Sequence, residues 1–282
     1  MKKTVMIMID GFGVPPEGWH KSVYAKYAEK GFVDMMAECS VPVAADLGIP
    51  GIPQSATGQT ALFTGLNAAE IMGRHSQGFP GPTLRKVIQK QNLFASLMSR
   101  GLKVTFANSY ARYTLKELAG LRMRSVTTVM TEASLGKVRN LDDLLDGNAV
   151  YHDLTRKSMP EEFNVTPVLP EEAAEDLAKI AEDNDFTLFE YFLTDRAGHK
   201  QDLNLLSTVL YEFSAFFMKL VECASNNLRI ILISDHGNCE EPETKLHSEN
   251  PVPFFLYGEN LKAAGTVNSI LDIYHYITEE KI

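Results

Sequence analysis

Three continuous apolar runs, each followed closely by an aspartate, constrain the fold of this chain most strongly. Runs of this length without polar alternation are typical of strands that are buried on both faces of a parallel sheet. In open α/β sheets, ligands bind beyond the carboxyl ends of the strands, so the three carboxylates are expected to converge there. The runs are Thr4–Ile9, Phe186–Leu193 and Arg229–Ser234, and the aspartates are Asp10, Asp195 and Asp235.

Helical patterns separate the apolar runs, and this alternation predicts an α/β fold with a mostly parallel sheet and helices on both faces. The helix Asn92–Arg100 is expected to end at Gly101, because glycine readily adopts the conformation that closes helices. The helix Glu171–Glu182 follows Pro170 and has acidic residues in its first turn, which the helix dipole favours. The remaining predicted elements are the helices Leu203–Glu222 and Ser269–Ile277 and the strands Lys103–Ala107 and Pro253–Tyr257.

The segment from about Ser109 to Val168 breaks this alternation. We predict that it forms a small cap or insertion, at about residues 109–168, within a single catalytic domain that spans residues 1–282. A chain of 282 residues with 45% apolar composition can bury one large core. The β-branched stretch Ser125–Met130 within the segment is expected to be extended. The segment also carries the basic residues Arg112, Arg122, Arg124, Arg139 and Arg156.

Charge and cysteine usage argue against several classes of protein. A net charge of -9, from 27 basic and 36 acidic residues, disfavours a surface that binds nucleic-acid phosphates. The N-terminal apolar run ends at Ile9 and is too short for a signal peptide or a membrane span. Cys39, Cys223 and Cys239 lack paired spacing, so we expect no disulfide framework and a cytoplasmic location. The oligomeric state is left open.

Two short motifs supply candidate metal ligands. In TDRAGH, Asp195 and His199 are four residues apart, so both side chains lie on one face if the segment is helical. A helix-capping aspartate beside an exposed histidine would have the same spacing. In SDHGN, Asp235 and His236 are adjacent, and both serve one site only where the backbone turns, which Gly237 permits.

Ser55 is the candidate nucleophile. The stretch IPQSATGQTALFTG begins with turn-forming residues and continues into a helix-compatible run, which places Ser55 at or near a helix N-terminus. The free amides and the dipole at such a terminus favour an anion such as phosphate. A simple capping role is the more frequent use of a serine at this position. Thr57 is the competing nucleophile in the same loop.

Together, the carboxylates and imidazoles provide donors for two divalent cations. One aspartate with two histidines suits one Zn²⁺ or Mn²⁺ ion, and two aspartates, a histidine and a serine oxygen suit another. His247, which lies eleven residues after His236, is of interest because of this position. Two such ions about 4 Å apart would lower the pKa of a serine hydroxyl and clamp a phosphoryl group. The donor set therefore predicts phosphoryl or sulfuryl transfer.

The order of these residues resembles the alkaline phosphatase superfamily, in particular the metalloenzyme branch of cofactor-independent phosphoglycerate mutase and phosphopentomutase. The stretch SDHGNCEE, followed by HSENPVPFFLYG, is especially similar to the mutase pattern. Ser55 stands three residues before Gly58, as in the mutases, and ten before Gly65, as in the nucleotide phosphodiesterases of the superfamily. The similarity covers roughly residues 1–70 and 185–260.

The resemblance implies an alkaline phosphatase-like fold, two bound divalent ions and a phosphoseryl intermediate on Ser55. It implies that one ion is held by Asp195, His199 and His247. It implies that the other ion is held by Asp10, Ser55, Asp235 and His236.

Several departures from the family pattern concern the substrate. The phosphoglycerate mutases carry a large inserted domain with an arginine-rich substrate cradle, whereas here only about a hundred residues separate Ser55 from the helix at Glu171. Gln59 stands where the mutases usually have histidine, and Gln54 stands where they have asparagine or aspartate. No cysteine occupies the nucleophile position, which disfavours a sulfatase.

The leading interpretation is a phosphatase or phosphodiesterase that acts on a small phosphorylated substrate. The short middle segment favours hydrolysis, because a mutase must shield its phosphoenzyme from water, whereas the DHGN to NPVP stretch favours a phosphomutase. A metal-binding relative without turnover is the third alternative. We interpret His20, His152 and His275 as structural or exposed. The candidate substrate contacts are Asn108, Arg74, His75 and Arg112.

Overall fold

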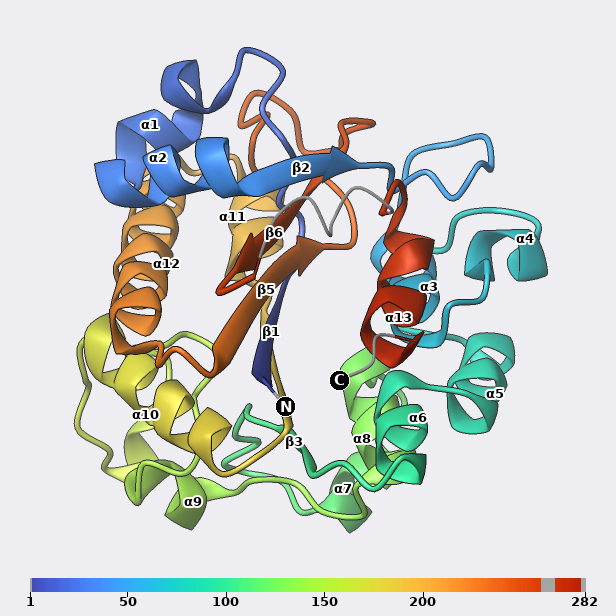
Figure 1. Cartoon of the computed structure of the whole chain (residues 1–282), viewed down its shortest axis with the longest axis vertical. Helices are drawn as coiled ribbons and strands as arrows, with labels where there is room; N and C mark the ends of the chain where they lie inside the picture. The colour runs from blue at the N-terminus through green and yellow to red at the C-terminus, as the bar shows by residue number, and fades with distance from the viewer. Residues whose placement is uncertain (1, 260–266, 280–282) are drawn as a thin grey trace.

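The computed structural model describes residues 2–259 and 267–279, which form a six-stranded sheet surrounded by helices (Figure 1). The strands are β1 Lys3–Ile9, β2 Ser40–Val43, β3 Val104–Phe106, β4 Phe186–Tyr191, β5 Leu228–Ser234 and β6 Val252–Tyr257. The α-helices are α1 Val23–Tyr27, α2 Lys30–Cys39, α3 Ser55–Thr64, α4 Ala68–Met72, α5 Pro82–Lys90, α6 Leu93–Ser99, α7 Leu115–Gly120, α8 Val126–Ser134, α9 Leu141–Leu145, α10 Pro170–Glu182, α11 Leu193–Lys200, α12 Leu203–Cys223 and α13 Ile270–Glu279. Two short 3₁₀ helices are η1 Trp19–Lys21 and η2 Glu161–Phe163.

The sheet is mostly parallel, as the apolar runs predict. Its strand order is β2-β6-β5-β1-β4-β3, and β1 pairs in parallel with both β4 and β5. Strand β3 continues the parallel arrangement beside β4, whereas β6 and β2 add antiparallel strands at the other side. Because Ile9 pairs with both Tyr191 and Ser234, the three central strands end level with one another. The residues that follow them therefore meet at one edge of the sheet.

Helices cover both faces of the sheet, and this explains why the central strands lack polar alternation. Val5, Ile7 and Ile9 of β1 pack into one hydrophobic core with residues of α10 and α12. Met6 and Met8 point the other way, into a second core with residues of α3, α8 and α13. Figure 1 shows these two groups of helices on opposite sides of the sheet. The predicted α/β architecture is confirmed.

Helix ends near the site follow the expected local chemistry, with one shift. The Asn92 side chain accepts a hydrogen bond from the amide of Ala95 and starts α6, and Gly101 has a φ of +82° just after that helix. Strand β4 ends at Tyr191, two residues earlier than predicted. Leu193 instead begins α11, so the TDRAGH motif lies on a helix.

The predicted strand over Ser125–Met130 is wrong, because this stretch forms most of helix α8. The Ser125 hydroxyl caps the helix by accepting a hydrogen bond from the amide of Thr128 at 3.1 Å. Val126, Val129 and Met130 recur at helical spacing and pack into the core that contains α3. Tertiary packing therefore overrides the weak β preference of the valines and threonines.

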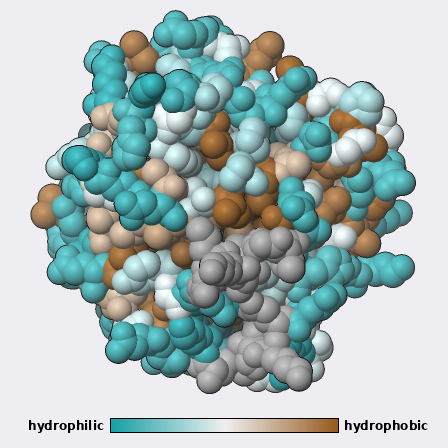
Figure 2. Space-filling model, turned by 45° about the horizontal axis from the view of Figure 1, so that its top comes forward, coloured by the Kyte–Doolittle hydropathy of each residue, from teal (hydrophilic) through white to brown (hydrophobic). Residues whose placement is uncertain are grey.

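The face drawn in Figure 2 is largely hydrophilic, with apolar areas between the polar side chains. Within residues 2–259 and 267–279, no helix combines the length and the hydrophobicity needed to cross a membrane. All three cysteines are free thiols, and Cys239 is buried beside the hydroxyl of Tyr24.

Candidate metal centre and substrate pocket

Five chain segments deliver the predicted ligands to the carboxyl edge of the central strands, the fifth being the loop before β6 that carries His247. Asp10 follows β1 directly, and Asp235 follows β5 directly. Asp195 lies in the first turn of α11, just after β4. Ser55 is the first residue of α3, so its hydroxyl lies at the positive end of that helix.

Ser55 belongs to a first cluster centred on the imidazole of His236. The Ser55 Oγ lies 2.9 Å from His236 Nε2, and the same nitrogen is 3.1 Å from Asp10 Oδ1 and 3.6 Å from Asp235 Oδ2. The competing hydroxyl, that of Thr57, is directed elsewhere, since it donates to a main-chain carbonyl at 3.1 Å and its residue is fully buried. Of the two, Ser55 is the one whose hydroxyl faces the cluster.

A second cluster is formed by Asp195, His199 and His247. His199 Nε2 lies 3.3 Å from Asp195 Oδ2, and His247 Nε2 lies 3.4 Å from Asp195 Oδ1 and 3.1 Å from His199 Nε2. The Nδ1 atoms of both histidines contact main-chain carbonyls, at Lys245 for His199 (2.7 Å) and at Pro53 for His247 (2.9 Å). These contacts direct both Nε2 atoms toward Asp195. Main-chain carbonyls that contact Nδ1 orient metal-bound histidines in the same way.

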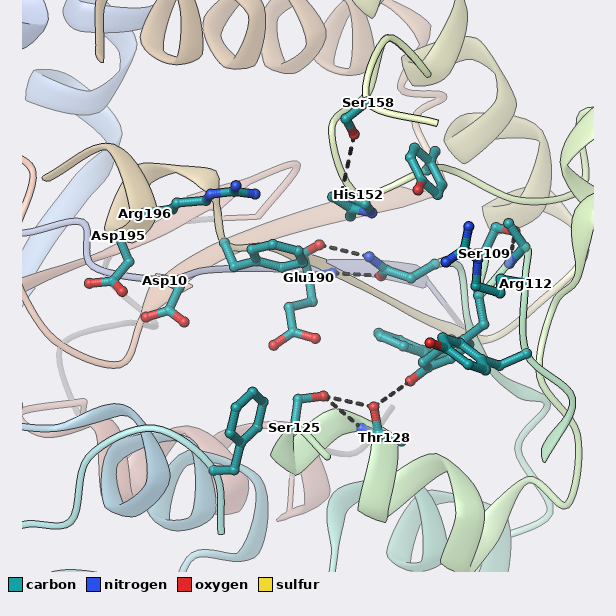
Figure 3. A pocket seen from close by; sticks show the side chains of 18 of the residues that line it. Asp10, Ser109, Arg112, Ser125, Thr128, His152, Ser158, Glu190, Asp195 and Arg196 are labelled. Atoms are coloured by element: carbon teal, nitrogen blue, oxygen red, sulfur yellow. Dashed lines mark hydrogen bonds between the residues drawn. The ribbon is translucent and has the colours of Figure 1, made fainter. Parts of the chain in front are cut away.

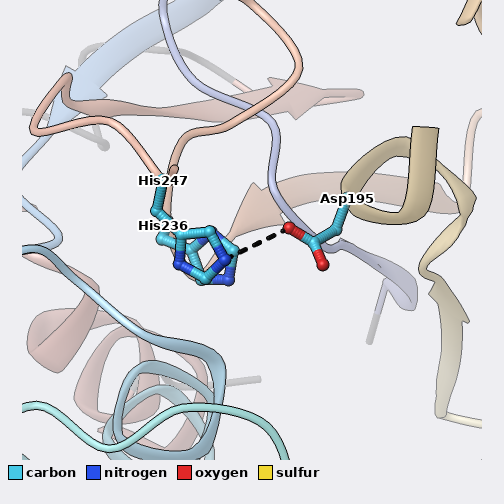
Figure 4. A group of neighbouring side chains, drawn as sticks. All are labelled: Asp195, His236 and His247. Carbon is cyan, nitrogen blue, oxygen red and sulfur yellow. Dashed lines mark ion pairs between the residues drawn. The ribbon is translucent and has the colours of Figure 1, made fainter. Parts of the chain in front are cut away.

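The two clusters are contiguous. The rings of His236 and His247 stack with centroids 3.8 Å apart and an interplanar angle of 12°. Figure 4 shows these two imidazoles facing the Asp195 carboxylate. Ligand atoms of Asp195, His236 and His247 lie within 4.8 Å of one another, as do those of Asp10, Asp235 and His236. The structure thus brings all seven residues together, with His236 between the clusters.

Two neutral side-chain amides hold the carboxylates in place. Asn238 donates a hydrogen bond to Asp195 Oδ1 at 2.7 Å, and Gln59 donates one to Asp10 Oδ2 at 3.2 Å. Gln59 lies on α3, one turn after Ser55, so this bond ties the nucleophile helix to the first cluster. Gln59, one of the two residues at which this chain departs from the mutase pattern, is therefore part of the centre.

Glu240 connects the loops that carry the ligands. It is buried, and its carboxylate accepts hydrogen bonds from the main-chain amides of Gly13 (2.9 Å) and Asn238 (2.8 Å). It also accepts hydrogen bonds from the Ser248 hydroxyl and from the Asn250 side-chain amide. One carboxylate therefore joins the loop after Asp10, the loop after His236 and the segment around His247.

At two glycines near the metal ligands, a side chain would collide with neighbouring atoms. A Cβ on Gly58 would lie 2.7 Å from the carbonyl oxygen of Asp235, so only glycine lets α3 approach the end of β5 this closely. The backbone bends at Asp235 and His236, directly before Gly237, and Gly237 is not among the positive-φ glycines of the described chain. A Cβ on Gly237 would lie 2.2 Å from Glu240 Oε1 and from Ser248 Oγ.

A cavity of about 600 Å³ opens beside the centre. Figure 3 shows Asp10 and Asp195 at one end and Arg112 at the other, with His152 and Thr128 on opposite walls. The walls far from the aspartates come from the loop after β3, from α8 and from residues 151–163, which belong to the segment predicted as a cap. Within that segment, α8 also packs against the core, so it is joined to the helical layer.

The four candidate substrate contacts are placed differently. Arg112 and Asn108 line the cavity. The amide of Asn108 is fully engaged, since it donates to the carbonyl oxygen of Glu190 and accepts from its main-chain amide, so it extends the pairing of β3 with β4. Arg74 and His75 are not among the lining residues, and His75 Nε2 instead lies 3.0 Å from a main-chain carbonyl.

Several lining residues carry no sequence signal for a site. Arg196 follows Asp195 on α11 and lines the cavity. Glu190 is buried at the end of β4, where Thr127 donates a hydrogen bond to it, and burial raises its pKa to about 7. His152, interpreted from sequence as structural or exposed, stacks on Phe192 in the cavity wall with ring centroids 5.0 Å apart. Only the position of Glu190 within an apolar run could have attracted attention.

The profile of the metalloenzyme superfamily matches residues 2–273. The chain belongs to this superfamily. Its fold is similar to that of an alkaline phosphatase from the Antarctic bacterium TAB5, with a TM-score of 0.63 and 12% identity over 99% of this chain and 98% of the other. It is also similar to the PH0037 protein from Pyrococcus horikoshii (TM-score 0.57, 14% identity, 99% and 96% coverage) and to an alkaline phosphatase from Thermus thermophilus (TM-score 0.55, 8% identity, 99% and 91% coverage). No match was found among curated proteins.

The buried carboxylate oxygens of this metalloenzyme are consistent with its membership of the superfamily. Both carboxylate oxygens of Asp235 are buried and have no hydrogen-bond partner in the described part of the chain. Asp10 Oδ1 is also buried and lies 3.1 Å from His236 Nε2. Unpaired buried acceptors are costly unless a cation satisfies them. Carboxylate and imidazole donors suit Zn²⁺ and Mn²⁺. The residues present therefore fit divalent metal ions.

Without metal, the clusters hold strongly perturbed groups. Burial and the neighbouring Asp235 carboxylate raise the pKa of Asp10 to about 8, and burial also raises that of Asp235. Burial opposes a charged His236, but the nearby Asp235 and Asp10 carboxylates outweigh it and raise the pKa to about 10. Burial opposes a charged Asp195, but its hydrogen bond with His199 and the neighbouring imidazoles lower the pKa to about 2. Burial and His236 lower the pKa of His247 to about 4.

These shifts predict that the metal-free metalloenzyme loses stability as pH rises from 6.5 to 8. Folded Asp10 keeps its proton up to about pH 8, whereas the unfolded residue loses it near 3.8, and folded His236 keeps its proton up to about pH 10 against an ordinary value of 6.5. Because Asp10 and His236 lie 3.1 Å apart and titrate together, the pair in the folded state binds at least about one more proton in this window, and the free energy of unfolding falls by about 1.4 kcal/mol per pH unit for that proton. Urea unfolding in a chelator at several pH values measures the slope. Asp10→Asn should flatten it, and a wild-type stability that rises with pH would contradict the prediction.

Removal of Glu240 should destabilise the metalloenzyme and loosen its centre. Glu240→Ala removes the acceptor of three buried donors and one of the two acceptors of the Asn250 side-chain amide, so we expect a loss of about 3 kcal/mol in the free energy of unfolding and weaker metal retention. Chemical denaturation and metal titration measure the two effects. Glu243→Ala, an exposed glutamate of the same segment, is the matched control and should behave like the wild type. Equal stability of both variants would refute the role of Glu240.

Proposed function

We propose that the protein is a metal-dependent phosphohydrolase, a phosphatase or phosphodiesterase in which Ser55 is the nucleophile. The observation that carries this proposal is the position of the Ser55 hydroxyl. It stands at the N-terminus of α3, 2.9 Å from His236 Nε2, and it lines the cavity of about 600 Å³. A hydroxyl at the positive end of a helix, beside metal-ligand donors and facing a substrate-sized cavity, suits attack on a phosphoryl group.

The ligand sets proposed for the two ions follow the two clusters. Asp195, His199 and His247 would hold one ion, and the other would be held by Asp10, Asp235, His236 and Ser55. Zn²⁺ and Mn²⁺ are both compatible with these donors. When bound, the ions would supply the positive charge that lowers the pKa of a serine hydroxyl and offsets charge on phosphoryl oxygens.

The proposed reaction has two steps, formation and hydrolysis of a phosphoserine. In the first, a bond forms between Ser55 Oγ and phosphorus, the ester P–O bond breaks, and the leaving alcohol departs with a proton. In the second, a water molecule attacks the phosphoserine, releases phosphate and restores the hydroxyl. The N-terminal amides of α3 and the Arg196 guanidinium, which lines the cavity beside Asp195, would orient the phosphoryl oxygens.

The rim of the cavity favours water as the acceptor. Phe79 and Tyr113 line the cavity and are 50% and 37% exposed, so the part of the wall that they form is open to solvent. A phosphomutase remains the second candidate, because the stretch from Asp235 to Pro253 is the most mutase-like part of the chain. A relative without turnover is disfavoured, since all presumed ligands and the nucleophile are present. A cytoplasmic location, expected from the three unpaired cysteines, is part of the proposal.

Turnover of p-nitrophenyl phosphate and bis-p-nitrophenyl phosphate with added Mn²⁺ or Zn²⁺ tests the proposal. We expect metal-dependent release of p-nitrophenol that a chelator abolishes. Release without metal, or none after metal loading is verified by elemental analysis, would count against it. To separate hydrolase from mutase, the phosphorylated enzyme is offered a sugar alcohol, and transfer to that acceptor in preference to water would favour the mutase.

A further inference from the structure

The cavity wall that lies beyond the reactive end is largely aromatic. Seven aromatic side chains from four separate segments line the cavity: Phe79, Phe106, Tyr110, Tyr113, Tyr151, Phe163 and Phe192. Aromatic side chains of this number around one cavity are typical of sites that bind a flat apolar group. The aromatic wall adjoins the same cavity that Ser55 and Asp195 line, so whatever it binds lies next to the phosphoryl group.

Part of the wall is a preformed stack of rings, which we call the platform. His152 stacks on Phe192 with an interplanar angle of 18°, and Tyr151 lies against His152 with ring centroids 4.2 Å apart. Phe192 is the residue that immediately precedes α11, the helix that carries Asp195. In Figure 3, His152 lies on the wall between the aspartates and Arg112. The platform is therefore fixed relative to the reactive end.

The far end of the cavity lacks a free positive charge. Arg112 and Arg196 are the only arginines that line the cavity, and no lysine of the described chain lines it. Arg112 is paired with Glu162 at 2.8 Å and lies over the ring of Phe163 at 5.8 Å, whereas Arg196 lies at the reactive end beside Asp195 (Figure 3). Burial lowers the pKa of His152, which keeps its ring neutral. A second anionic group on a substrate would therefore find no unpaired cation there.

Two of the aromatic side chains are exposed to water at the rim. Phe79 is 50% exposed and Tyr113 is 37% exposed, although both are large hydrophobic residues that could pack into a core. Exposed apolar side chains at the mouth of a cavity commonly mark a ligand-binding surface.

We propose that the group esterified to the phosphate in the substrate is a neutral aromatic ring system, bound by Phe79, Tyr113 and the platform formed by Phe192 and His152. This inference rests on the proposed phosphoryl-transfer function and specifies its substrate class. It disfavours substrates with an anionic second end, such as phosphoglycerate, because Arg112, the one cation of the described residues at that end of the cavity, is already paired with Glu162.

Binding of three non-hydrolysable phosphonates to the Mn²⁺-supplemented protein tests the inference without turnover. The probes are 2-phenylethylphosphonate, 2-cyclohexylethylphosphonate, which is similar in size but not flat, and 3-phosphonopropionate, which has an anionic end. By calorimetric titration, we expect the phenyl probe to bind about tenfold more tightly than the cyclohexyl probe and more tightly still than the anionic probe.

Phe79→Ala should reduce the preference for the phenyl probe over the cyclohexyl probe at least about threefold. Because Phe79 is half exposed, this variant is expected to fold normally. Tyr211→Ala is the matched control, since Tyr211 is an exposed aromatic residue (56%) on α12 that does not line the cavity, and it should leave the preference unchanged.

Each result separates this inference from the proposed function. Equal affinities for the phenyl and cyclohexyl probes, or tighter binding of the anionic probe, would overturn the aromatic substrate class and leave phosphoryl transfer on Ser55 standing. Binding of the phenyl probe with the expected preference, combined with full activity of Ser55→Ala, would retain the inference about the binding group and overturn the proposed nucleophile. Failure of all three probes to bind would overturn the inference about the binding group, whereas the proposed function would still be decided by turnover of p-nitrophenyl phosphate.

Discussion

Replacement of Ser55 by alanine is expected to reduce metal-dependent phosphate-ester turnover by at least about a thousandfold. The substitution removes the hydroxyl that lies 2.9 Å from His236 Nε2 and faces the cavity, and no other hydroxyl lies in this position within the described chain. The change removes one hydroxyl from the first residue of α3 and leaves the methyl group of alanine, so the protein should still fold. Steady-state kinetics with p-nitrophenyl phosphate, alongside the thermal unfolding midpoint, measure both expectations.

Thr57→Val is the control for this experiment. Thr57 is the second hydroxyl of the same helix, but its side chain is fully buried and directed to a main-chain carbonyl, so its loss should affect stability more than chemistry. We expect the valine variant to retain activity within about tenfold of the wild type. Activity that survives in Ser55→Ala and disappears in Thr57→Val would assign the nucleophile to Thr57 instead.

Asp235→Asn is expected to have opposite consequences with and without metal. In the metal-free protein, both Asp235 oxygens are buried without hydrogen-bond partners in the described part of the chain, and burial raises the pKa of this carboxyl. Removal of its charge at pH 8 should leave the free energy of unfolding unchanged or increase it. With metal at a thousandfold excess over its dissociation constant, the free energy of unfolding of the wild type should increase by about 4 kcal/mol. The increase for the variant should be less than half of that.

The two stabilities are measured by chemical denaturation in a chelator and in excess Mn²⁺, with metal content determined by elemental analysis. Asp142→Asn is a matched control, because Asp142 is exposed on α9 and far in sequence from every proposed ligand. It should show the wild-type gain on metal addition. An Asp235→Asn protein that is as strongly stabilised by metal as the wild type would exclude Asp235 as a ligand.

The arrangement of the polar centre was predictable because its residues follow apolar runs. Asp10 and Asp235 come directly after β1 and β5, and parallel strands that end level must bring such residues to one edge. The four-residue spacing of Asp195 and His199 indicated a shared helical face, and both lie on α11 as expected. His247 could be assigned only through the family resemblance, since its position depends on a loop without periodicity.

The cavity walls could not be predicted in the same way. Residues such as Phe192 and His152 come from segments 40 positions apart and meet through tertiary packing, which leaves no local pattern. In the sequence, Glu240 is one of several acidic residues in a loop. Its role is apparent only in the structure, where four donors form hydrogen bonds with its carboxylate. The β-branched residues of Ser125–Met130 favour a strand locally, but their contacts with the core select a helix.

Identification of the phosphorylated residue tests the central claim most directly. The metal-loaded protein is mixed with p-nitrophenyl phosphate, quenched in acid within one turnover and digested, and its peptides are analysed by mass spectrometry. We predict a single phosphoryl group on Ser55, lost on a longer incubation in water and absent when a chelator is added first. Phosphate on Thr57, or sustained turnover in which the Ser55 peptide is never phosphorylated, would contradict the assignment.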